Sequence, residues 1–413
     1  MPPRNEMQPS LRTQQGAAFI VMLVILVMGI TALFVSSLDS AALRNLRNEK
    51  TSEALATARD ALQGYALRNA KRPGALPCPD TNNDGVAEGS CAGANLLGRL
   101  PWKTLGLPEL RDGYNETLWY ALAPEFVNSG SSLNSDTSGA LSLSGSSNLT
   151  ALVFSAGAVL PNQQRDANNM ICPLDGASRP ANRCASNYLE GENQDNDYVF
   201  VRAPQTDTFN DVVLELKAET LLPAVEQRIA REVVACLKDY AASNPWGRFP
   251  WSTKLDGGSS PSYNDKSDER FGRLPDDLSN TRSDSSGTMP DVWPSTEACN
   301  GIFPTTSGWW NNSKWKELVF YAVTSRYKPK DSTPSSCGTS SCLSVNPPSA
   351  DYDKKVVVIV AGKKLAGQNR SSNADKANLS NYLEGNNATA ATTKIFEQGT
   401  QSATFNDTVL FIQ

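Results

Sequence analysis

The residues from position 80 to position 88 are the ones whose types and spacing could most directly do chemistry. Oxygen-bearing side chains alternate there in the pattern typical of a calcium loop, and Gly85 permits the sharp turn that such a loop needs. The candidate calcium ligands are Asp80, Asn82, Asp84, the carbonyl group of Val86, and Glu88. The twelfth position is Cys91 instead of a bidentate glutamate, which excludes a complete EF-hand. The alternative is an Asx-rich turn closed by a disulfide bond between Cys78 and Cys91.

Catalysis is limited by the complete absence of histidine. A Ser-His-Asp triad, a Cys-His pair and an HExxH zinc site are all excluded. Paired carboxylates of the glycosidase type remain open, but no spacing among the acidic residues singles out a pair. We therefore predict that the protein is not an enzyme and that it requires no cofactor, with calcium as the single ion that the sequence suggests.

Tryptophans gather in the C-terminal third of the chain. The candidate binding residues are Trp293, Trp309, Trp310 and Trp315. Aromatic side chains at a surface stack on sugar rings or anchor a protein partner. The alternative interpretation is that they fill the core of a small domain.

Eight cysteines lie beyond residue 77, and none forms the CxxC spacing of a zinc ribbon or a redox site. An even number of cysteines favours disulfide bonds in an oxidising compartment. Eight cysteines allow about 105 connectivities, so the sequence fixes none of them. Short loops favour Cys78 with Cys91, Cys172 with Cys184, and Cys337 with Cys342, which leaves Cys236 for Cys299.

Residues 17–38 form an uncharged apolar run, AAFIVMLVILVMGITALFVSSL. A helix of this length would extend ~33 Å, enough to cross a bilayer once. The polar leader in front of it carries Arg4 and Arg12, which predicts a cytoplasmic N-terminus and an external body. From Ser40 to Asn69 the chain continues without proline, and apolar residues recur at helical spacing from Ala54 to Tyr65. The sequence therefore predicts one long helix whose first half is apolar all round and whose second half is two-faced.

This N-terminal pattern resembles the type IV pilins and the pseudopilins of type II secretion. The residues that carry the resemblance are Gln14-Gln15-Gly16, then Ala17-Ala18-Phe19 and the apolar run, then the stripe from Glu53 to Ala66. The resemblance implies cleavage by a prepilin peptidase between Gly16 and Ala17 and methylation of the new N-terminus. It also implies an assembly platform and other pilin-like subunits as partners.

The chain departs from the family pattern at two positions. Ala17 stands where the family has phenylalanine, and Val21 stands where it has a glutamate that pairs with the N-terminal amine of a neighbouring subunit. Valine has no carboxylate for that contact. In the family, minor subunits at the filament tip are the ones that lack this glutamate, so the resemblance implies a minor or initiating subunit.

Several motifs recur in the same order along the external body. Asn187-Tyr-Leu-Glu-Gly191 returns as Asn381-Tyr-Leu-Glu-Gly385, and Thr208-Phe-Asn-Asp211 returns as Thr404-Phe-Asn-Asp407. A second amphipathic stretch, residues 222–243, matches the helix that ends near Tyr65, with Tyr240 at the equivalent position. We infer an internal duplication.

These patterns predict an α+β fold. Its parts would be a long N-terminal transmembrane-plus-amphipathic helix on an antiparallel sheet, then a second pilin-like head of helix plus sheet. The predicted domains are a leader (1–16), a membrane segment (17–38), a first head with its amphipathic helix (39–217) and a second head without a membrane segment (218–413).

The charge balance favours a structural role over nucleic-acid binding. Lys and Arg total 38 against 43 Asp and Glu, a net charge of −5, so no broad positive field is available for a phosphate backbone. We predict a minor pilin-like or pseudopilin-like subunit in the bacterial inner membrane, with its body in the periplasm and at the cell surface once assembled. The alternatives are a membrane-tethered adhesin whose tryptophan-rich second head binds a glycan or protein, and, less favoured, an anchored periplasmic enzyme.

Overall fold

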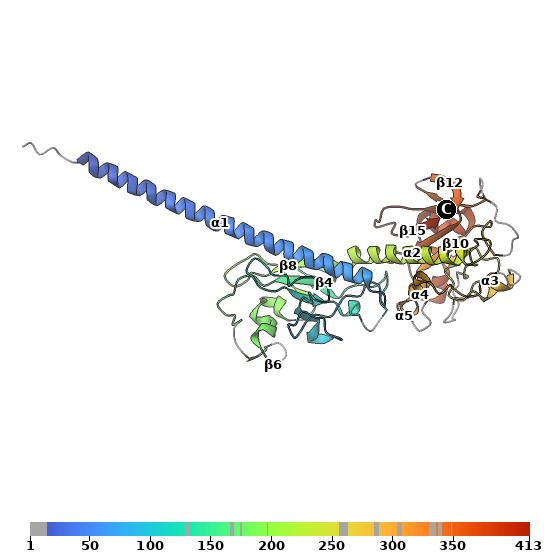
Figure 1. Cartoon of the computed structure of the whole chain (residues 1–413), viewed down its shortest axis with the longest axis horizontal. Coiled ribbons are helices and arrows are strands. Elements are labelled where there is room, and N and C mark those ends of the chain that lie inside the picture. The colour runs from blue at the N-terminus through green and yellow to red at the C-terminus, as the bar shows by residue number, and fades with distance from the viewer. Residues whose placement is uncertain are drawn as a thin grey trace, which may run out of the picture.

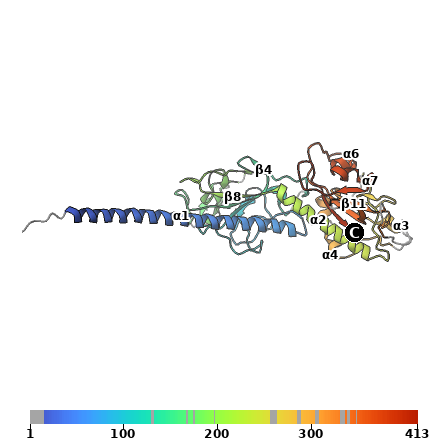
Figure 2. The ribbon, with the colours of Figure 1, turned by 90° about the horizontal axis from the view of Figure 1, so that it is seen from above.

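The computed structural model describes residues 15–128, 132–165, 169–173, 176–195, 197–255, 263–284, 289–303, 308–329, 336–337, 341–347 and 349–413. Figure 1 shows a helix that projects from one end, followed by two units of sheet and helix arranged along the long axis. The second view, in Figure 2, shows the same tandem order.

The first helix, α1, covers Gln15–Arg68. Its described side chains from residue 19 to residue 28 are exposed, and so are those from 41 to 50. Burial begins at Thr51, where small and aliphatic residues recur at helical spacing. The buried apolar residues of this stripe are Ala54, Leu55, Ala58, Leu62 and Ala66. Only this last part of α1 therefore has the one-sided pattern that packing against a body requires.

In the first unit, β1 (Leu97–Arg99), β2 (Trp119–Leu122), β4 (Ser146–Ser155) and β8 (Val212–Lys217) pair in that order, all antiparallel. The N-terminal part of β4 also pairs with β3 (Leu141–Leu143), which pairs in parallel with β7 (Val199–Phe200). A separate hairpin joins β5 (Met170–Ile171) to β6 (Ser178–Arg179).

In the second unit, α2 (Ala218–Ala242) buries one apolar face, from Leu221 to Tyr240. Four strands pair antiparallel in the order β9 (Phe271–Arg273), β10 (Val319–Val323), β13 (Val356–Val360) and β15 (Thr408–Ile412). A three-stranded sheet joins β12 (Ser349–Lys354), β11 (Leu343–Asn346) and β14 (Ile395–Glu397), the last pair being parallel. The short helices are α3 (Ser279–Asp284), α4 (Glu297–Ile302), α5 (Trp309–Asn312), α6 (Asn373–Ala377) and α7 (Ala390–Thr393).

The two units share one strand order. The path β1-β2-β4-β8 corresponds to β9-β10-β13-β15, and the parallel pair β3–β7 corresponds to β11–β14. The long strand β4 corresponds to two strands of the second unit, β12 and β13, which are separated there by one residue. The motifs that recur in the sequence therefore lie at equivalent places in the topology.

The predicted fold class is wrong. Across the described ranges, no helix is both long enough and apolar enough to cross a membrane. The described apolar side chains of residues 19–28 do not pack on a sheet, because a segment that is apolar all round has no single face to match to one. Each unit contains one parallel strand pair, so its strands are not purely antiparallel, and the body is mainly β-structure. Part of the predicted membrane segment (residues 17, 18, 29 and 32–38) has side chains outside the described part of the structure.

Candidate functional site

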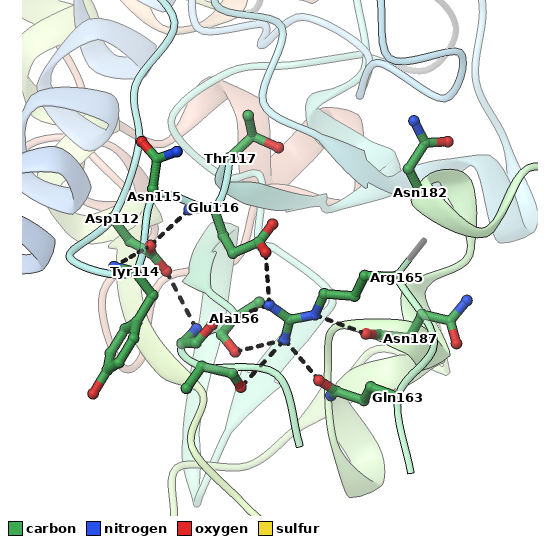
Figure 3. A network of polar contacts seen from close by, with 12 residues as sticks. Asp112, Tyr114, Asn115, Glu116, Thr117, Ala156, Gln163, Arg165, Asn182 and Asn187 are labelled. Atoms are coloured by element: carbon green, nitrogen blue, oxygen red, sulfur yellow. Dashed lines mark hydrogen bonds and ion pairs between the residues drawn. The ribbon is translucent and has the colours of Figure 1, made fainter. Parts of the chain in front are cut away.

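Arg165 is the centre of a buried polar network in the first unit (Figure 3). Its side chain is 5% exposed and forms a 3.1 Å ion pair with Glu116. Its guanidinium donates to the carbonyl of Asn187 at 3.1 Å, to that of Gly157 at 3.0 Å, and to Oε1 of Gln163 at 2.7 Å. Arg165 therefore holds the end of β4 and the following loop to the segment around Asn187.

A second arginine shares the aromatic ring beside this network. The guanidinium of Arg99 lies 4.0 Å from the ring centroid of Tyr188, and that of Arg165 lies 4.6 Å from it. Burial lowers the pKa of Arg99 to about 10. The carbonyl of Thr117 accepts a 2.8 Å hydrogen bond from Arg99, so this cation is compensated by hydrogen bonds and by the π face.

Asp112 fixes the adjoining loop, as Figure 3 shows. One carboxylate oxygen accepts hydrogen bonds from the backbone of Tyr114 and Glu116, and the other accepts from the hydroxyl of Ser155 and the backbone of Gly157. The loop that carries Glu116 is thereby attached to the end of β4.

Two carboxyl groups meet on the far side of the same segment. Asp211 Oδ2 accepts hydrogen bonds from the backbone of Glu190 and from the side chain of Asn193, and Glu190 Oε2 accepts from the backbone of Asn210. Burial, and next the charge of Glu190, raise the pKa of Asp211 to about 8. A proton is therefore retained on this pair at neutral pH.

The second unit repeats the main backbone and carboxylate contacts of this network. Arg370 donates to Asn381 O at 2.7 Å and to Gly362 O at 3.1 Å, as Arg165 does to Asn187 and Gly157. Gln368 donates to a carboxylate oxygen of Glu384 at 2.7 Å, and Asp407 accepts from the backbone of Glu384 at 3.0 Å. Burial raises the pKa of Asp407 well above its ordinary value.

The two copies differ in the acid that pairs with the arginine. Arg165 pairs within its own unit, whereas Nη1 of Arg370 donates to both carboxylate oxygens of Asp136 in the first unit, at 3.0 and 3.1 Å. Asn134 of the first unit also donates to Ser313 O at 2.8 Å. The second network therefore fixes the first unit to the second.

We expect the buried acid pairs to make the protein less stable as pH rises. Asp211 keeps its proton to about pH 8 in the folded chain but loses it near pH 4 when unfolded, so the folded state binds more protons between these values. The unfolding temperature should fall by several degrees from about pH 5 to about pH 9. Thermal melts across that range check this, and Asp211→Asn should remove part of the slope.

The matched control is Asp60→Asn, at a side chain that is 65% exposed, which should leave the slope unchanged. Stability that increases with pH across this interval would contradict the assignment.

The predicted calcium loop adopts the arrangement of its alternative. Asp80 Oδ1 accepts backbone hydrogen bonds from Asn82, Asn83 and Asp84, and its Oδ2 accepts from Gly85 at 2.7 Å. Both carboxylate oxygens are thus engaged by the turn itself. The carboxylate of Glu88 is bonded to Thr81, and Asp84 Oδ1 accepts from the backbone of Val86. Within the described residues, no group of three or more Cys, Asp or Glu side chains is placed to hold a metal ion.

The tryptophans lie mainly in the core. Trp309, Trp310 and Trp315 are buried, and the half-buried Trp293 stacks on Phe303 with ring centroids 4.8 Å apart. This is the arrangement that the alternative interpretation predicts, and it leaves the three buried rings no face for a sugar.

The predicted disulfide bonds are confirmed. The pairs are Cys78–Cys91, Cys172–Cys184, Cys236–Cys299 and Cys337–Cys342. The predicted processing residues Gly16 and Ala17 lie within α1, but their side chains are outside the described part, as are all of residues 1–14 of the leader.

The sequence interpretation missed Gln163 and Arg165 and their counterparts Gln368 and Arg370. A signal for them was present. Gly157 and Gly362 are 205 residues apart, and so are Gln163 and Gln368, and Arg165 and Arg370. A comparison of the two units that continued eight residues beyond these glycines would have found both pairs.

The exposed apolar part of α1 is the surface best suited to a partner. Ten consecutive side chains from Phe19 to Met28 are exposed, Phe19 and Met22 by 70%. Figure 1 shows this end of α1 extending away from both units. Contiguous apolar surface of this kind marks a site of interaction with protein or lipid. The buried networks, by contrast, hold loops in place through the contacts given above.

No protein-family model, curated protein or solved structure matches the chain.

Proposed function

We propose that this protein is a structural subunit of a type IV pilus or type II secretion filament, in a minor or initiating position. The single observation that supports this proposal best is the projecting helix with exposed apolar side chains from Phe19 to Met28. Such a segment can be held in lipid before assembly and among the same segments of neighbouring subunits afterwards. In this role Val21 offers no carboxylate to a neighbour's amine, which suits a subunit with none ahead of it.

The location and partners follow from the same proposal. The subunit would reside in the bacterial inner membrane with a cytoplasmic N-terminus, be cleaved by a prepilin peptidase, and be taken up by an assembly platform. Four disulfide bonds in the body suit an oxidising periplasm. The fully assembled form would lie at the cell surface.

Mass spectrometry of the N-terminus tests the processing step. We expect the protein purified from cells to begin at Ala17 with a methylated amine. Gly16→Val should leave the chain at its full length. A wild-type protein that still begins at Met1 would overturn the proposal.

A charge in the exposed apolar segment should abolish incorporation into filaments. Leu23 is about half exposed, so Leu23→Glu should leave the fold intact while a carboxylate in an apolar bundle costs about 2–3 kcal/mol or more. Asn48→Glu, at an exposed position of the same helix, is the matched control and should assemble normally. Immunoblots of sheared filaments measure both, and equal incorporation of the two variants would count against the role.

A further inference from the structure

A cavity of about 320 Å³ lies where the first unit meets the second. Its walls come from the loop at Ser135, from the first turns of α2, and from the loops that follow β13 and precede β15. The residues that matter here are Ser135, Leu222, Pro223, Glu226, Leu365 and Asn406. The walls are mainly aliphatic, with a small number of polar atoms, which is the usual composition of a ligand site.

Glu226 is the unexplained group in this cavity. It is 2% exposed, and its Oε2 has no hydrogen-bond partner among the described groups. Burial raises its pKa to about 8. The hydroxyl of Ser135 and the charge of Arg370 oppose this rise, and the charges of Asp136 and Glu384 add to it. A buried carboxyl oxygen without a partner is costly, so a native protein has a reason to keep it.

The first unit shows that the repeat does not need this carboxylate. With Tyr65 equivalent to Tyr240, the position of Glu226 corresponds to Thr51. The hydroxyl of Thr51 donates to Arg47 O at 2.8 Å and accepts from the backbone of Gly113 at 3.0 Å. At this position the first unit has a threonine whose hydroxyl is hydrogen-bonded. The second unit has a glutamate with one carboxyl oxygen that lacks a hydrogen-bond partner among the described groups.

The unpartnered atoms define the chemistry of a ligand. Besides Glu226 Oε2, the hydroxyl of Ser135 and the Oδ1 atom of Asn406 have no hydrogen-bond partner among the described groups, although Asn210, the counterpart of Asn406, shares this property. All three oxygens can accept hydrogen bonds, so a ligand that donates hydrogen bonds is complementary to them, and the aliphatic walls suit an alkyl chain behind the donor.

Lys363 and Lys364 line the cavity, but they do not prevent a positive ligand from entering it. Lys363 lies 3.8 Å from the carboxylate of Glu219, and Arg370 is paired with Asp136. Lys364 is exposed, so solvent and salt screen its charge. We propose that this cavity binds a primary ammonium group carried on a short aliphatic chain, with the carboxylate of Glu226 as its counterion.

Binding should be coupled to a proton. Because Glu226 retains its proton up to about pH 8, an ammonium that pairs with the carboxylate must displace that proton at neutral pH. Affinity should therefore rise as pH is increased from 6 to about 8. The heat of binding at pH 7 should depend on the ionisation heat of the buffer, which a merely apolar cavity would not produce.

Calorimetric titration of the full chain with butylamine tests the proposal. Glu226→Gln preserves shape but removes the charge, and it should weaken binding at least about tenfold. Glu192→Gln, at an exposed position that does not line the cavity, is the control and should change binding little. Thermal melts show that each variant is folded.

Nα-acetyl-lysine amide distinguishes the two sources of the ligand. If it binds as butylamine does, the side chain of a partner's lysine can reach the cavity; if only butylamine binds, the ligand is a free small amine. Absence of heat with both probes at millimolar concentration, or equal binding by wild type and Glu226→Gln, would overturn the proposal and leave water as the occupant.

Discussion

Replacing Arg165 by methionine should lower the free energy of unfolding by about 3–5 kcal/mol. Methionine keeps most of the aliphatic packing but leaves the carbonyls of Gly157 and Asn187 without their donor and Glu116 without its cation. Urea titration of the full chain measures the loss. If the methionine variant does not accumulate, Arg165→Lys can be measured in its place, because lysine keeps the positive charge but lacks the several N–H donors of the guanidinium group.

The matched control is Arg59→Met. Arg59 also forms an arginine–carboxylate pair, with Asp60, but the two side chains are 39% and 65% exposed. An exposed pair of this kind contributes about 0.2–1 kcal/mol at most. Equal losses for Arg59→Met and Arg165→Met would show that the buried network does not carry the stability assigned to it.

Removing the disulfide bond between Cys236 and Cys299 should cost about 4 kcal/mol. This bond joins α2 to α4 across 63 residues, and closing a loop of that length removes considerable entropy from the unfolded chain. The double variant Cys236→Ala/Cys299→Ala should therefore unfold at a markedly lower urea concentration. The pair Cys337–Cys342 spans only five residues, and its removal should cost about 2 kcal/mol.

Urea titrations of the two double-alanine variants under non-reducing conditions provide the comparison. A smaller loss from the long-range pair than from the short one would contradict this expectation. Such an outcome would mean either that α2 and α4 remain in contact in the unfolded chain, or that strain in the folded protein offsets the entropic stabilisation by the long-range disulfide bond.

Local sequence determined the parts of this protein that depend on neighbours in the chain. The two-faced stripe from Ala54 to Ala66 predicted a packed helix, and its buried residues are those that the 3.6-residue period selects. The short cysteine spacings favoured three of the four disulfide bonds and left the fourth by elimination. The motifs that recur in the same order predicted a duplicated unit, because a repeated motif favours the same local turns and strands each time.

Long-range pairing decided the rest. Nothing in the local pattern shows that β3 and β7, or β11 and β14, pair in parallel, since parallel partners are joined by long connections that carry no turn signal. The apolar run from residue 17 predicted a membrane-spanning helix, but no helix among the described residues is long and apolar enough to span a membrane, and the described side chains of that run are exposed.

The sequence by itself determined two copies of one glutamine–arginine motif, whereas only the tertiary structure decided which acid pairs with each arginine. Arg165 and Arg370 each follow a glutamine by two residues, and the Nε atom of each donates to the equivalent asparagine carbonyl of its own unit. The approach of Asp136 from the other unit, across 234 residues, turns the second copy into a link between units. Charge pairing depends on distance in space, and a one-dimensional pattern contains no such distance until the chain is folded.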